Sequence, residues 1–534
     1  MSAWEGTGLL LRHLLRRERF ATPAWILLLV VMVVGTVPHY ARMFSTEPLR
    51  QDFAEFVRHN TLTLAFGGQL SNARLESLAA WKIGDILYSL LGLMTALLVI
   101  RHTRAEEESG RLELLAAGGI GRFAPLTATL LLACGASVLT GLLCALGWIA
   151  LGCEPVGSLA FGCALAAPGC VFAAVAALAA QLGASTRMAT GMTFASLGAG
   201  YVLRFVADGS GQLWLRWLSP QGWSHLVEPF ADRRWWILGL PLLVTLVLAG
   251  VAHVLVASRD LGSGVLPSRP APEDTPGLRS PLALAWRLQR GLLLGWMSAF
   301  ALLGAFVGGL LQGLNEVGGQ NPWWREIVNR YGSGPNVRIS ELLAWVLLLS
   351  LGYLATLYPI LVTLRLRSEE EQGRAELVLS TAVGRVRWAA SHLVFVVLGP
   401  VAMMAASGIA LGLVHGSNTG EVALQLSRSL EGALLQVPAI WTIAGIAVFA
   451  YGVVPRFTSA IGWTTFLFIN VFGEVLGPIL GLEYAVANQA IPFHHLPRIL
   501  SGGAFTVIPL LVLTGLAAVL GTTGVLVLRR RDLD

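Results

Sequence analysis

Long apolar stretches, separated by short polar ones, follow each other along almost the whole chain. Each stretch is long enough to cross a bilayer core about 30 Å thick as an α-helix. The pattern therefore predicts an all-α polytopic membrane protein with about twelve transmembrane helices. The expected spans cover residues 22–42, 81–101, 124–151, 159–182, 189–206, 235–258, 291–312, 341–364, 387–413, 429–452, 459–480 and 503–528.

One polar segment between these spans occurs twice. The sequence Arg-Ala-Glu-Glu-Glu-Ser-Gly-Arg-Leu-Glu-Leu begins at Arg104, and Arg-Ser-Glu-Glu-Glu-Gln-Gly-Arg-Ala-Glu-Leu begins at Arg367. Both copies close with a Gly-Arg pair, and 10 of the 19 aligned residues are identical. An internal repeat fixes the architecture before any single motif does. The same surface element occurs twice, so a partner that binds it is expected to be present in two copies.

The repeat extends over two halves of six spans each. Even the ends agree, because Arg259-Asp-Leu closes the first half and Arg531-Asp-Leu closes the second. Since six is an even number, both halves enter the membrane in the same orientation, which makes a parallel repeat about an axis along the membrane normal. The predicted organisation is a first transmembrane half over 1–262, a semi-rigid cytoplasmic linker rich in proline over 263–281, and a second transmembrane half over 282–534.

Composition agrees with a membrane protein. The 534 residues are 55% hydrophobic and only 13% charged, with a mean hydropathy of +0.68, whereas a soluble domain has about 25% charged residues. The chain has 36 arginines and a single lysine, a ratio that suggests a GC-rich bacterial genome, so the predicted location is a bacterial plasma membrane. Of the arginines, 23 fall on segments that this topology places inside, which predicts both termini in the cytoplasm. Basic amphipathic helices at 9–17 and 282–290 are expected to lie at the inner surface. The five cysteines lie in apolar helices and are expected to be packing residues.

The repeated loops have the features of short surface helices. Three consecutive glutamates favour a helix N-terminus, and Glu107 with Arg111 is predicted to form an ion pair four residues apart. Glu370 and Arg374 are predicted to do the same. The plainer alternative is an ordinary solvated loop with positive-inside arginines. An acidic cluster in both copies, which the topology rule does not explain, favours a docking element instead.

These loops resemble those of a known family. The segments from Glu108 to Leu114 and from Glu371 to Leu377 look like the E-x-G-x-x-E-L loop of bacterial ATP-binding-cassette (ABC) exporter permeases. The two fused halves are similar to actinobacterial permeases that export polyketide antibiotics. The resemblance implies that loops 102–122 and 365–385 are coupling helices, each seated in a groove of a nucleotide-binding subunit. The residues expected to couple to that subunit are Glu106, Glu107, Glu108, Gly110, Arg111, Glu113, Leu114, Glu369, Glu370, Glu371, Gly373, Arg374, Glu376 and Leu377.

The ATPase site is expected in another chain. A phosphate-binding Walker A loop needs a lysine after glycine, followed by serine or threonine. The single lysine, Lys82, lies between Trp81 and Ile83. We therefore expect a transport subunit that is not an enzyme and has no cofactor of its own. ATP and magnesium are expected in two copies of the partner ATPase, and no nucleic acid is an expected partner.

Two charges within the predicted spans are candidates for the transport path. Arg204 in the fifth span and Glu474 in the eleventh occupy equivalent positions of the repeat. In the resembling fold these helices face the central axis, which gives the hypothesis that the two charges meet there as a gate or polar belt. The alternative is that both side chains reach outward to the lipid interface. Asp85 is expected to be an interfacial cap at the start of the second span, and a role in binding substrate is the alternative.

Other residues form weaker patterns. His494 and His495 are adjacent but lack further ligands, so a metal site is not expected. Ser224, His225 and Glu228 lack the strained turn of a hydrolase nucleophile, so hydrolysis is not expected. Aromatic residues of the axis-facing helices either line an apolar cavity or pack in the ordinary way. They are Tyr88, Phe194, Tyr353, Trp463 and Phe466.

The predicted function is export of lipophilic or amphipathic compounds, such as drugs, polyketide antibiotics or lipids, powered by the separate ATPase. Few fixed charges in the spans favour this cargo. The alternatives are a proton-coupled secondary transporter of twelve helices and a non-transporting sensor or scaffold in the membrane. The secondary transporter would need buried titratable residues and a basic G-x-x-x-D-R-x-G-R-R type of loop after the second span, where this chain has an acidic one.

Overall fold

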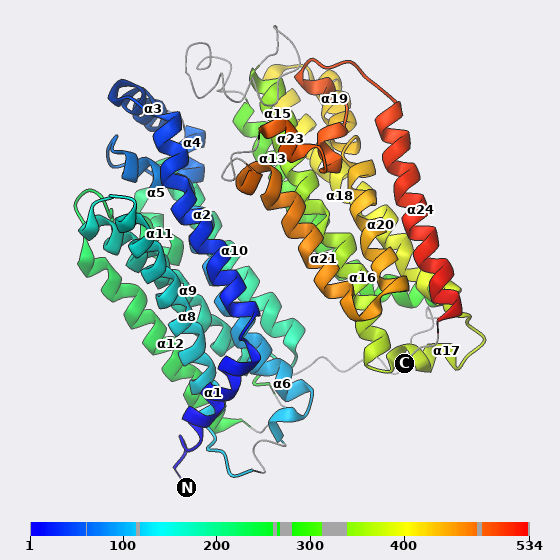
Figure 1. Ribbon diagram of the computed structural model, residues 1–534, viewed down its shortest axis with the longest axis horizontal. Coiled ribbons are helices and arrows are strands. Elements are labelled where there is room, and N and C mark those ends of the chain that lie inside the picture. Colours follow the sequence, from blue (N-terminus) through cyan, green and yellow to red (C-terminus); the bar gives the residue numbers. More distant parts are fainter. Residues whose placement is uncertain are drawn as a thin grey trace. The chain divides into compact units, whose positions relative to one another are not determined.

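Helices make up most of the chain that the structure describes, and no strand occurs in that part. A computed structural model describes residues 2–59, 61–113, 118–259, 264–266, 280–311, 339–477 and 483–531. Contacts divide the chain into two compact units, Met1–Ala271 and Pro272–Asp534. Within each unit the long helices run side by side (Figure 1). The predicted all-α polytopic fold is confirmed, while most of the predicted linker lies outside the described residues.

The first unit contains the six expected helices and several short ones. The long helices are α2 (Ala21–Met43), α5 (Leu75–His102), α8 (Ala124–Ala150), α9 (Pro155–Leu182), α10 (Thr186–Ser210) and α12 (Gly239–Ser258). The short ones are α1 (Thr7–Arg17), α3 (Glu47–His59), α4 (Thr61–Gly67), α6 (Arg104–Glu108), η1 (Leu213–Leu218), α11 (Pro220–Leu226) and η2 (Trp235–Leu238). The short helices after α2 and α10 were not predicted.

The second unit follows the same order. Its longer helices are α13 (Pro281–Leu310), α15 (Ile339–Ala355), α16 (Leu357–Glu371), α18 (Arg385–Thr419), α19 (Val422–Leu434), α20 (Val437–Val453), α21 (Thr458–Leu467) and α24 (Ile508–Arg530). The shorter ones are α17 (Arg374–Leu379), η4 (Pro455–Phe457), the π-helix η5 (Phe468–Leu476), α23 (Tyr484–Asn488), η6 (Pro492–His495) and η7 (Ile499–Ser501). The amphipathic helix predicted at 282–290 is not separate, because it continues without a break into α13.

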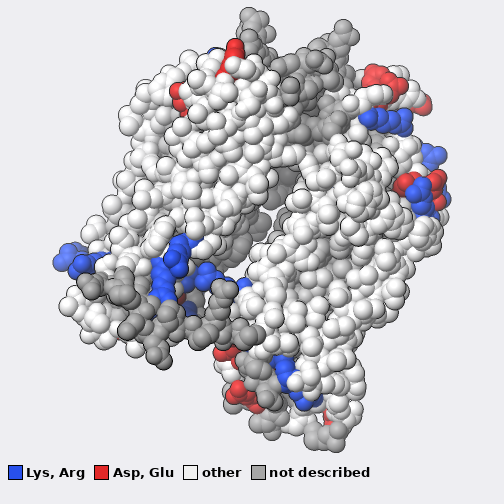
Figure 2. All heavy atoms as spheres, turned by 180° about the vertical axis from the view of Figure 1, so that it is seen from behind, with Lys and Arg blue, Asp and Glu red and all other residues white. Residues whose placement is uncertain are grey.

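Among the described residues, ten helices are long and apolar enough to cross a membrane. The two expected spans outside this set are the fifth of each half. In the first unit α10 is 25 residues long, but it carries Arg187, Arg204 and Asp208. In the second unit the α-helix gives way to the π-helix η5, so no single α-helix there is long enough. Figure 2 shows charged residues gathered toward the ends of the units, with a broad uncharged surface between.

The core of the first unit depends on small residues and on hydroxyls that replace missing backbone bonds. A Cβ at Gly141 of α8 would lie 2.2 Å from the carbonyl oxygen of Gly162 of α9, so only glycine allows these helices to approach so closely. Pro168 cannot donate a backbone hydrogen bond within α9. The Ser224 hydroxyl donates instead to the Ala164 carbonyl at 2.7 Å, which satisfies the freed acceptor.

Candidate functional site

A glycine in the left-handed conformation shapes both repeated loops. Gly110 has φ of 70° and Gly373 has φ of 68°. The amide of each donates to the carbonyl three residues before it, that of Glu107 at 3.1 Å and that of Glu370 at 3.0 Å. A Cβ at either glycine would meet nothing within 4 Å. The motif therefore requires glycine for its backbone conformation and not for space, and this turn lets the chain leave the glutamate-bearing helix.

Replacing Gly373 with alanine is expected to destabilise the second loop by about 1–2 kcal/mol, because an L-residue is strained in this conformation. Asparagine tolerates the left-handed region better, so Gly373→Asn is expected to cost less than Gly373→Ala. Detergent-solubilised variants can be compared by SDS-induced unfolding. Equal stability of Gly373→Ala and the parent would show that the loop does not need this backbone geometry.

In the first loop Glu106 and Glu107 point into the protein. Glu107 is buried between two guanidinium groups, at 2.8 Å from Arg104 and 2.8 Å from Arg259. Glu106 lies 2.5 Å from Arg17 at the end of α1 and 3.6 Å from Arg111. The predicted pair of Glu107 with Arg111 is therefore wrong. Gly110 ends the helix between the two residues, so they no longer share a helix face.

The second loop holds its glutamates in the same way. Glu370 pairs with Arg531 and accepts a hydrogen bond from the Tyr451 hydroxyl at 2.7 Å. Glu369 lies 2.9 Å from Arg374 and 3.7 Å from Arg365. The predicted pair of Glu370 with Arg374 is wrong for the same reason, since Gly373 stands between them. Each loop is thus tied to its own unit by buried or largely buried carboxylates.

The ion pairs and hydrogen bonds that attach the loop to its unit, called ties below, are the same in both units. This explains why the sequence of the loop is duplicated. Glu107 binds Arg259 and Glu370 binds Arg531, in each case the first residue after the last helix of the half. The closing Gly-Arg pairs bind the same positions. The Arg122 guanidinium donates to the Arg259 carbonyl at 2.6 Å, and the Arg385 guanidinium donates to the Arg531 carbonyl at 2.5 Å. The similarity of the two chain ends noted in the sequence is therefore part of the loop's attachment.

The first arginine of each copy adds a third common tie. Arg104 donates to the Ala184 carbonyl at 2.6 Å, just before α10. Arg367 donates to the Arg456 carbonyl at 3.2 Å, just before α21. Each loop is therefore bonded to two neighbours, the start of the fifth helix and the end of the last helix of its half. Sequence reasoning missed these contacts, although conservation of the arginines within the repeat was a usable signal.

The first loop is also joined to the junction between α1 and α2. Glu18 is buried there, 2.6 Å from the His102 ring, and it pairs with Arg101. Burial raises the pKa of Glu18, but the hydrogen bond with His102 and the charge of Arg101 outweigh it, so the pKa lies below its ordinary value. The carboxylate is ionised at neutral pH and fastens α1 beside the loop.

A second set of loop residues faces outward. In the first loop Glu108, Arg111 and Glu113 are exposed, and in the second their equivalents Glu371, Arg374 and Glu376 are exposed too. Leu377 is 75% exposed. Its counterpart Leu114 lies outside the described residues. The predicted coupling set therefore divides into inward glutamates that hold the loop and an outer face, formed in the second unit by Glu371, Arg374, Glu376 and Leu377.

Arg204 lies at the centre of a buried charge cluster in the first unit. Its guanidinium is 2.6 Å from Asp85 and 3.3 Å from Asp208, and it donates to the Ala65 carbonyl at 2.8 Å. Asp208 also pairs with Arg216. Arg204 has no exposed surface, so the alternative in which it reaches the lipid interface is wrong. The Glu474 side chain lies outside what the structure describes, so its pairing with Arg204 stays a prediction.

Asp85 is not an interfacial cap. The helix α5 begins at Leu75 and not near residue 81, which places Asp85 inside the helix and 3% exposed. It also lies 3.3 Å from His225.

Ser224 donates to a backbone carbonyl and is not activated by His225, so these residues do not form a nucleophile and base. In the second unit, His495 contacts the Gln489 carbonyl at 2.8 Å, and His494 lies 3.5 Å from the Arg498 guanidinium.

The aromatic candidates for a transport path differ in their surroundings. Tyr88 is buried and lies edge-on to His225, with ring centroids 5.3 Å apart. Tyr353 packs on Phe493 at 4.4 Å. Both make ordinary packing contacts within their units. Phe194 and Trp463 are 42% and 43% exposed, and Trp463 lies edge-on to Phe466. Their lining of a transport cavity remains a prediction.

Two comparisons identify relatives of this chain. Residues 278–529 match the family described as "Multidrug efflux system permease Rv1217c, C-terminal domain". The whole chain is similar to the "Multidrug efflux system permease protein Rv1217c" of Mycobacterium tuberculosis (strain ATCC 25618 / H37Rv). The two are 40% identical over 536 aligned residues, which cover 99% of this chain and 96% of that protein.

Proposed function

Because this chain belongs to the family of the multidrug efflux system permease Rv1217c, we propose that it is the membrane subunit of an ABC exporter. The observation that carries the proposal is the pair of loops with the same internal ties and an exposed outer face. A separate ATPase subunit binds ATP and magnesium, and one copy of it docks on each loop. The loops and both termini then lie on the cytoplasmic side of the plasma membrane.

The ties give each loop a way to pass force to the membrane helices. An ATPase that closes on ATP moves the outer face, which carries Glu376 and Leu377 in the second unit. The inward glutamates connect that face to the end of α24 through Arg531, and the first arginine connects it to the start of α21. Movement of the loop therefore displaces two helices of its half together. The same connections in the first unit run to α12 and α10.

The proposed cargo is lipophilic or amphipathic. The exposed surfaces of the long helices are almost entirely apolar, and the buried charged residues of the first unit form ion pairs with each other. A binding surface with few free charges favours compounds that bury apolar area over ionic solutes. Drugs, polyketide antibiotics and lipids all have this character.

The runner-up function is a proton-coupled secondary transporter. The observation that favours it is the pair of buried carboxylates, Asp85 and Asp208, beside His225 in the first unit. Buried acidic residues in membrane helices commonly form proton relays. Co-expression with the ATPase encoded beside the gene separates the two functions. Substrate-stimulated ATP hydrolysis by a co-purified complex supports the exporter, and proton-driven transport by the chain alone supports the runner-up.

Docking of the ATPase can be tested on the outer face. The double variant Glu376→Arg/Leu377→Asp is expected to weaken binding of the ATPase copy on the second loop by at least about tenfold, because exposed interface anchors are worth about 2 kcal/mol or more. The co-purified complex is then expected to hold at most one ATPase per chain. Membrane insertion is expected to stay unchanged. The control is Glu421→Arg, an exposed glutamate just before α19, at the other end of the long helix α18. Undiminished co-purification with the double variant would remove the docking assignment.

A further inference from the structure

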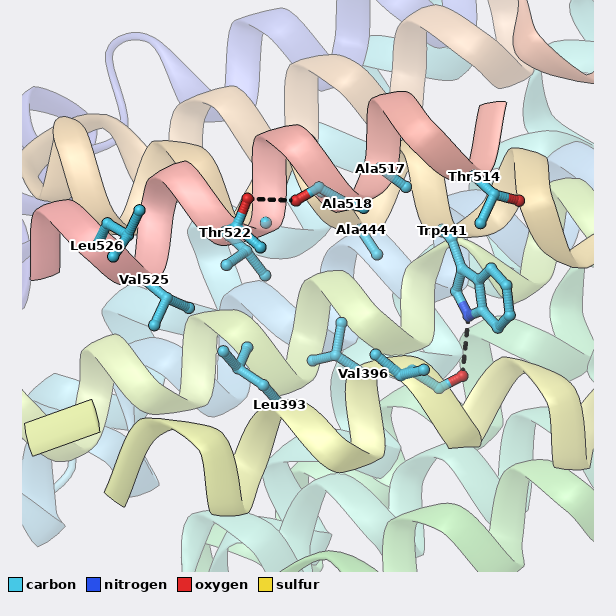
Figure 3. Close-up of a pocket in the computed structure, with 14 residues that line it drawn as sticks. Leu393, Val396, Trp441, Ala444, Thr514, Ala517, Ala518, Thr522, Val525 and Leu526 are labelled. Atoms are coloured by element: carbon cyan, nitrogen blue, oxygen red, sulfur yellow. Dashed lines mark hydrogen bonds between the residues drawn. The ribbon is translucent and has the colours of Figure 1, made fainter. Parts of the chain in front are cut away.

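An apolar groove runs along the second unit between α18 and α24, with α20 as its floor. It has a volume of about 590 Å³. Figure 3 shows Leu393 and Val396 on the α18 side, Ala444 on the floor, and Ala518 and Leu526 on the α24 side. Small residues make the space, since Ala444, Gly445, Ala517 and Gly521 all contribute to its lining.

The groove has three polar side chains, those of Trp441, Thr514 and Thr522, and two of them are hydrogen-bonded within the protein. The Trp441 indole donates to the Val397 carbonyl at 2.9 Å, and the Thr522 hydroxyl donates to the Ala518 carbonyl at 2.7 Å, as Figure 3 shows. Leu526 of the lining is itself 61% exposed. A groove of this kind within a membrane-spanning region suits a hydrocarbon chain and gives no orientation to a polar solute.

One end of the groove leads to unpaired positive charge. Arg530 lies one helical turn, about 5.4 Å, beyond Leu526 on the same face of α24. Arg529 is next to it, and both side chains are exposed. Among the residues that the structure describes, neither has an acidic partner, whereas Arg531 is engaged by Glu370. Guanidinium groups at a membrane surface favour phosphate, which they bind through two parallel hydrogen bonds.

The first unit differs from the second at several of these positions. In the register of the repeat, Val175 stands where the second unit has Gly445, and Ala257 and Ser258 stand where it has Arg529 and Arg530. The position of Val525 corresponds to His253, which is covered by the Trp4 ring at 5.2 Å. The N-terminal segment of the chain therefore packs against the cytoplasmic end of the comparable face in the first unit. The second unit, with its amphipathic segment built into α13, leaves its groove open to another apolar occupant.

We propose that this groove holds an acyl chain of an anionic phospholipid, whose phosphate is bound by Arg529 and Arg530. The site belongs to the second half alone, and the lipid packs between α24 and α18 beside the helix that ends at the loop contact Arg531. It is a resident lipid site and not a cargo site. The proposal does not rest on the exporter function, because binding is measured without an ATPase partner.

The test uses the full-length chain in detergent, titrated with phosphatidylglycerol or with phosphatidylcholine of the same chain length and followed by native mass spectrometry. Ala518→Phe fills the groove from an exposed position, and Val519→Phe on the same helix is its matched control. Arg529→Gln/Arg530→Gln removes the phosphate-binding charge. Arg12→Gln, at an exposed position of the amphipathic α1, is the control for general attraction of anionic lipid.

We expect one saturable phosphatidylglycerol per chain, bound more tightly than phosphatidylcholine. Ala518→Phe and the double arginine variant are each expected to weaken it by about tenfold or more, the first because it fills the groove and the second because it removes the charges that bind the phosphate. The two controls are expected to leave it unchanged. Equal weakening by the controls, or no preference for phosphatidylglycerol, would reduce the site to ordinary surface lipid. Displacement of the lipid by exported compounds would assign the groove to cargo instead.

Discussion

The variant Arg204→Ala is expected to destabilise the first unit by about 3–5 kcal/mol, as removal of one partner from a buried ion pair typically does. The guanidinium stands between Asp85 and Asp208, whose side chains are 4% and 0% exposed. Without it, both carboxylates remain inside the protein, and only Asp208 keeps a second cation, Arg216. SDS-induced unfolding of the purified protein, followed by tryptophan fluorescence, measures the loss.

Two further variants serve as controls for the loss of stability expected of Arg204→Ala. Arg187→Ala, at an exposed position of the same helix, is expected to change the unfolding free energy by no more than about 0.5 kcal/mol. Removing both charges in Arg204→Gln/Asp85→Asn is expected to recover part of the stability, because no unpaired carboxylate is left at Asp85. A loss below about 1 kcal/mol for Arg204→Ala would mean that water reaches the cluster and that the charges are not buried in the membrane-embedded protein.

The same residue tests the hypothesis of a charge pair across the central axis. Arg204 already has two acidic partners within its own unit. We therefore expect Arg204→Ala and Glu474→Ala to have additive effects on transport, as independent sites do. A coupling energy of about 1 kcal/mol or more in the double-mutant cycle would restore the gate or polar belt that the equivalent positions of Arg204 and Glu474 suggested.

The architecture could be predicted because its signals are local. A membrane span needs about twenty consecutive apolar residues, which can be seen directly in the sequence. The repeated charged segment can also be recognised without knowing which residues contact each other. Asp85 shows how a small error in the predicted start of a helix changes the role assigned to a residue. Placing the helix start near residue 81 made Asp85 a cap, whereas the start at Leu75 makes it a buried partner of Arg204.

The direction of the loop glutamates could not be predicted in the same way. The spacing of Glu107 and Arg111 suggested a surface pair on one helix, but the left-handed Gly110 breaks that helix. The true partner, Arg259, is far along the chain and is brought close only by packing of the last helix. Repetition of Arg259 and Arg531 at equivalent ends was the one sequence feature that pointed to this contact.

The variant Glu107→Ala is expected to cost about 3 kcal/mol of unfolding free energy and to uncouple ATP hydrolysis from transport. Its side chain is 4% exposed, and its removal leaves the guanidinium groups of Arg104 and Arg259 without their shared anion. Glu370→Ala is expected to cost less, because the pair of Glu370 with Arg531 is 10% and 17% exposed. Both variants remove the ion pair between the loop and the last helix of its half and leave only the bond from Arg122 or Arg385 to the backbone there, so a docked ATPase moves that helix less effectively.

Control variants distinguish the attachment of the loop to its last helix from docking of the ATPase on the loop. Glu108→Ala and Glu371→Ala, on the exposed side of the same loops, are expected to change stability by less than about 1 kcal/mol, as exposed ion pairs do. Exchanging the charges in Glu370→Arg/Arg531→Glu is expected to recover coupling in part, because the tie is remade with reversed sign. The ATPase should still co-purify with Glu107→Ala, since the outer face is untouched. Loss of co-purification with full retention of stability would show that Glu107 contacts the partner directly and would overturn the inward assignment.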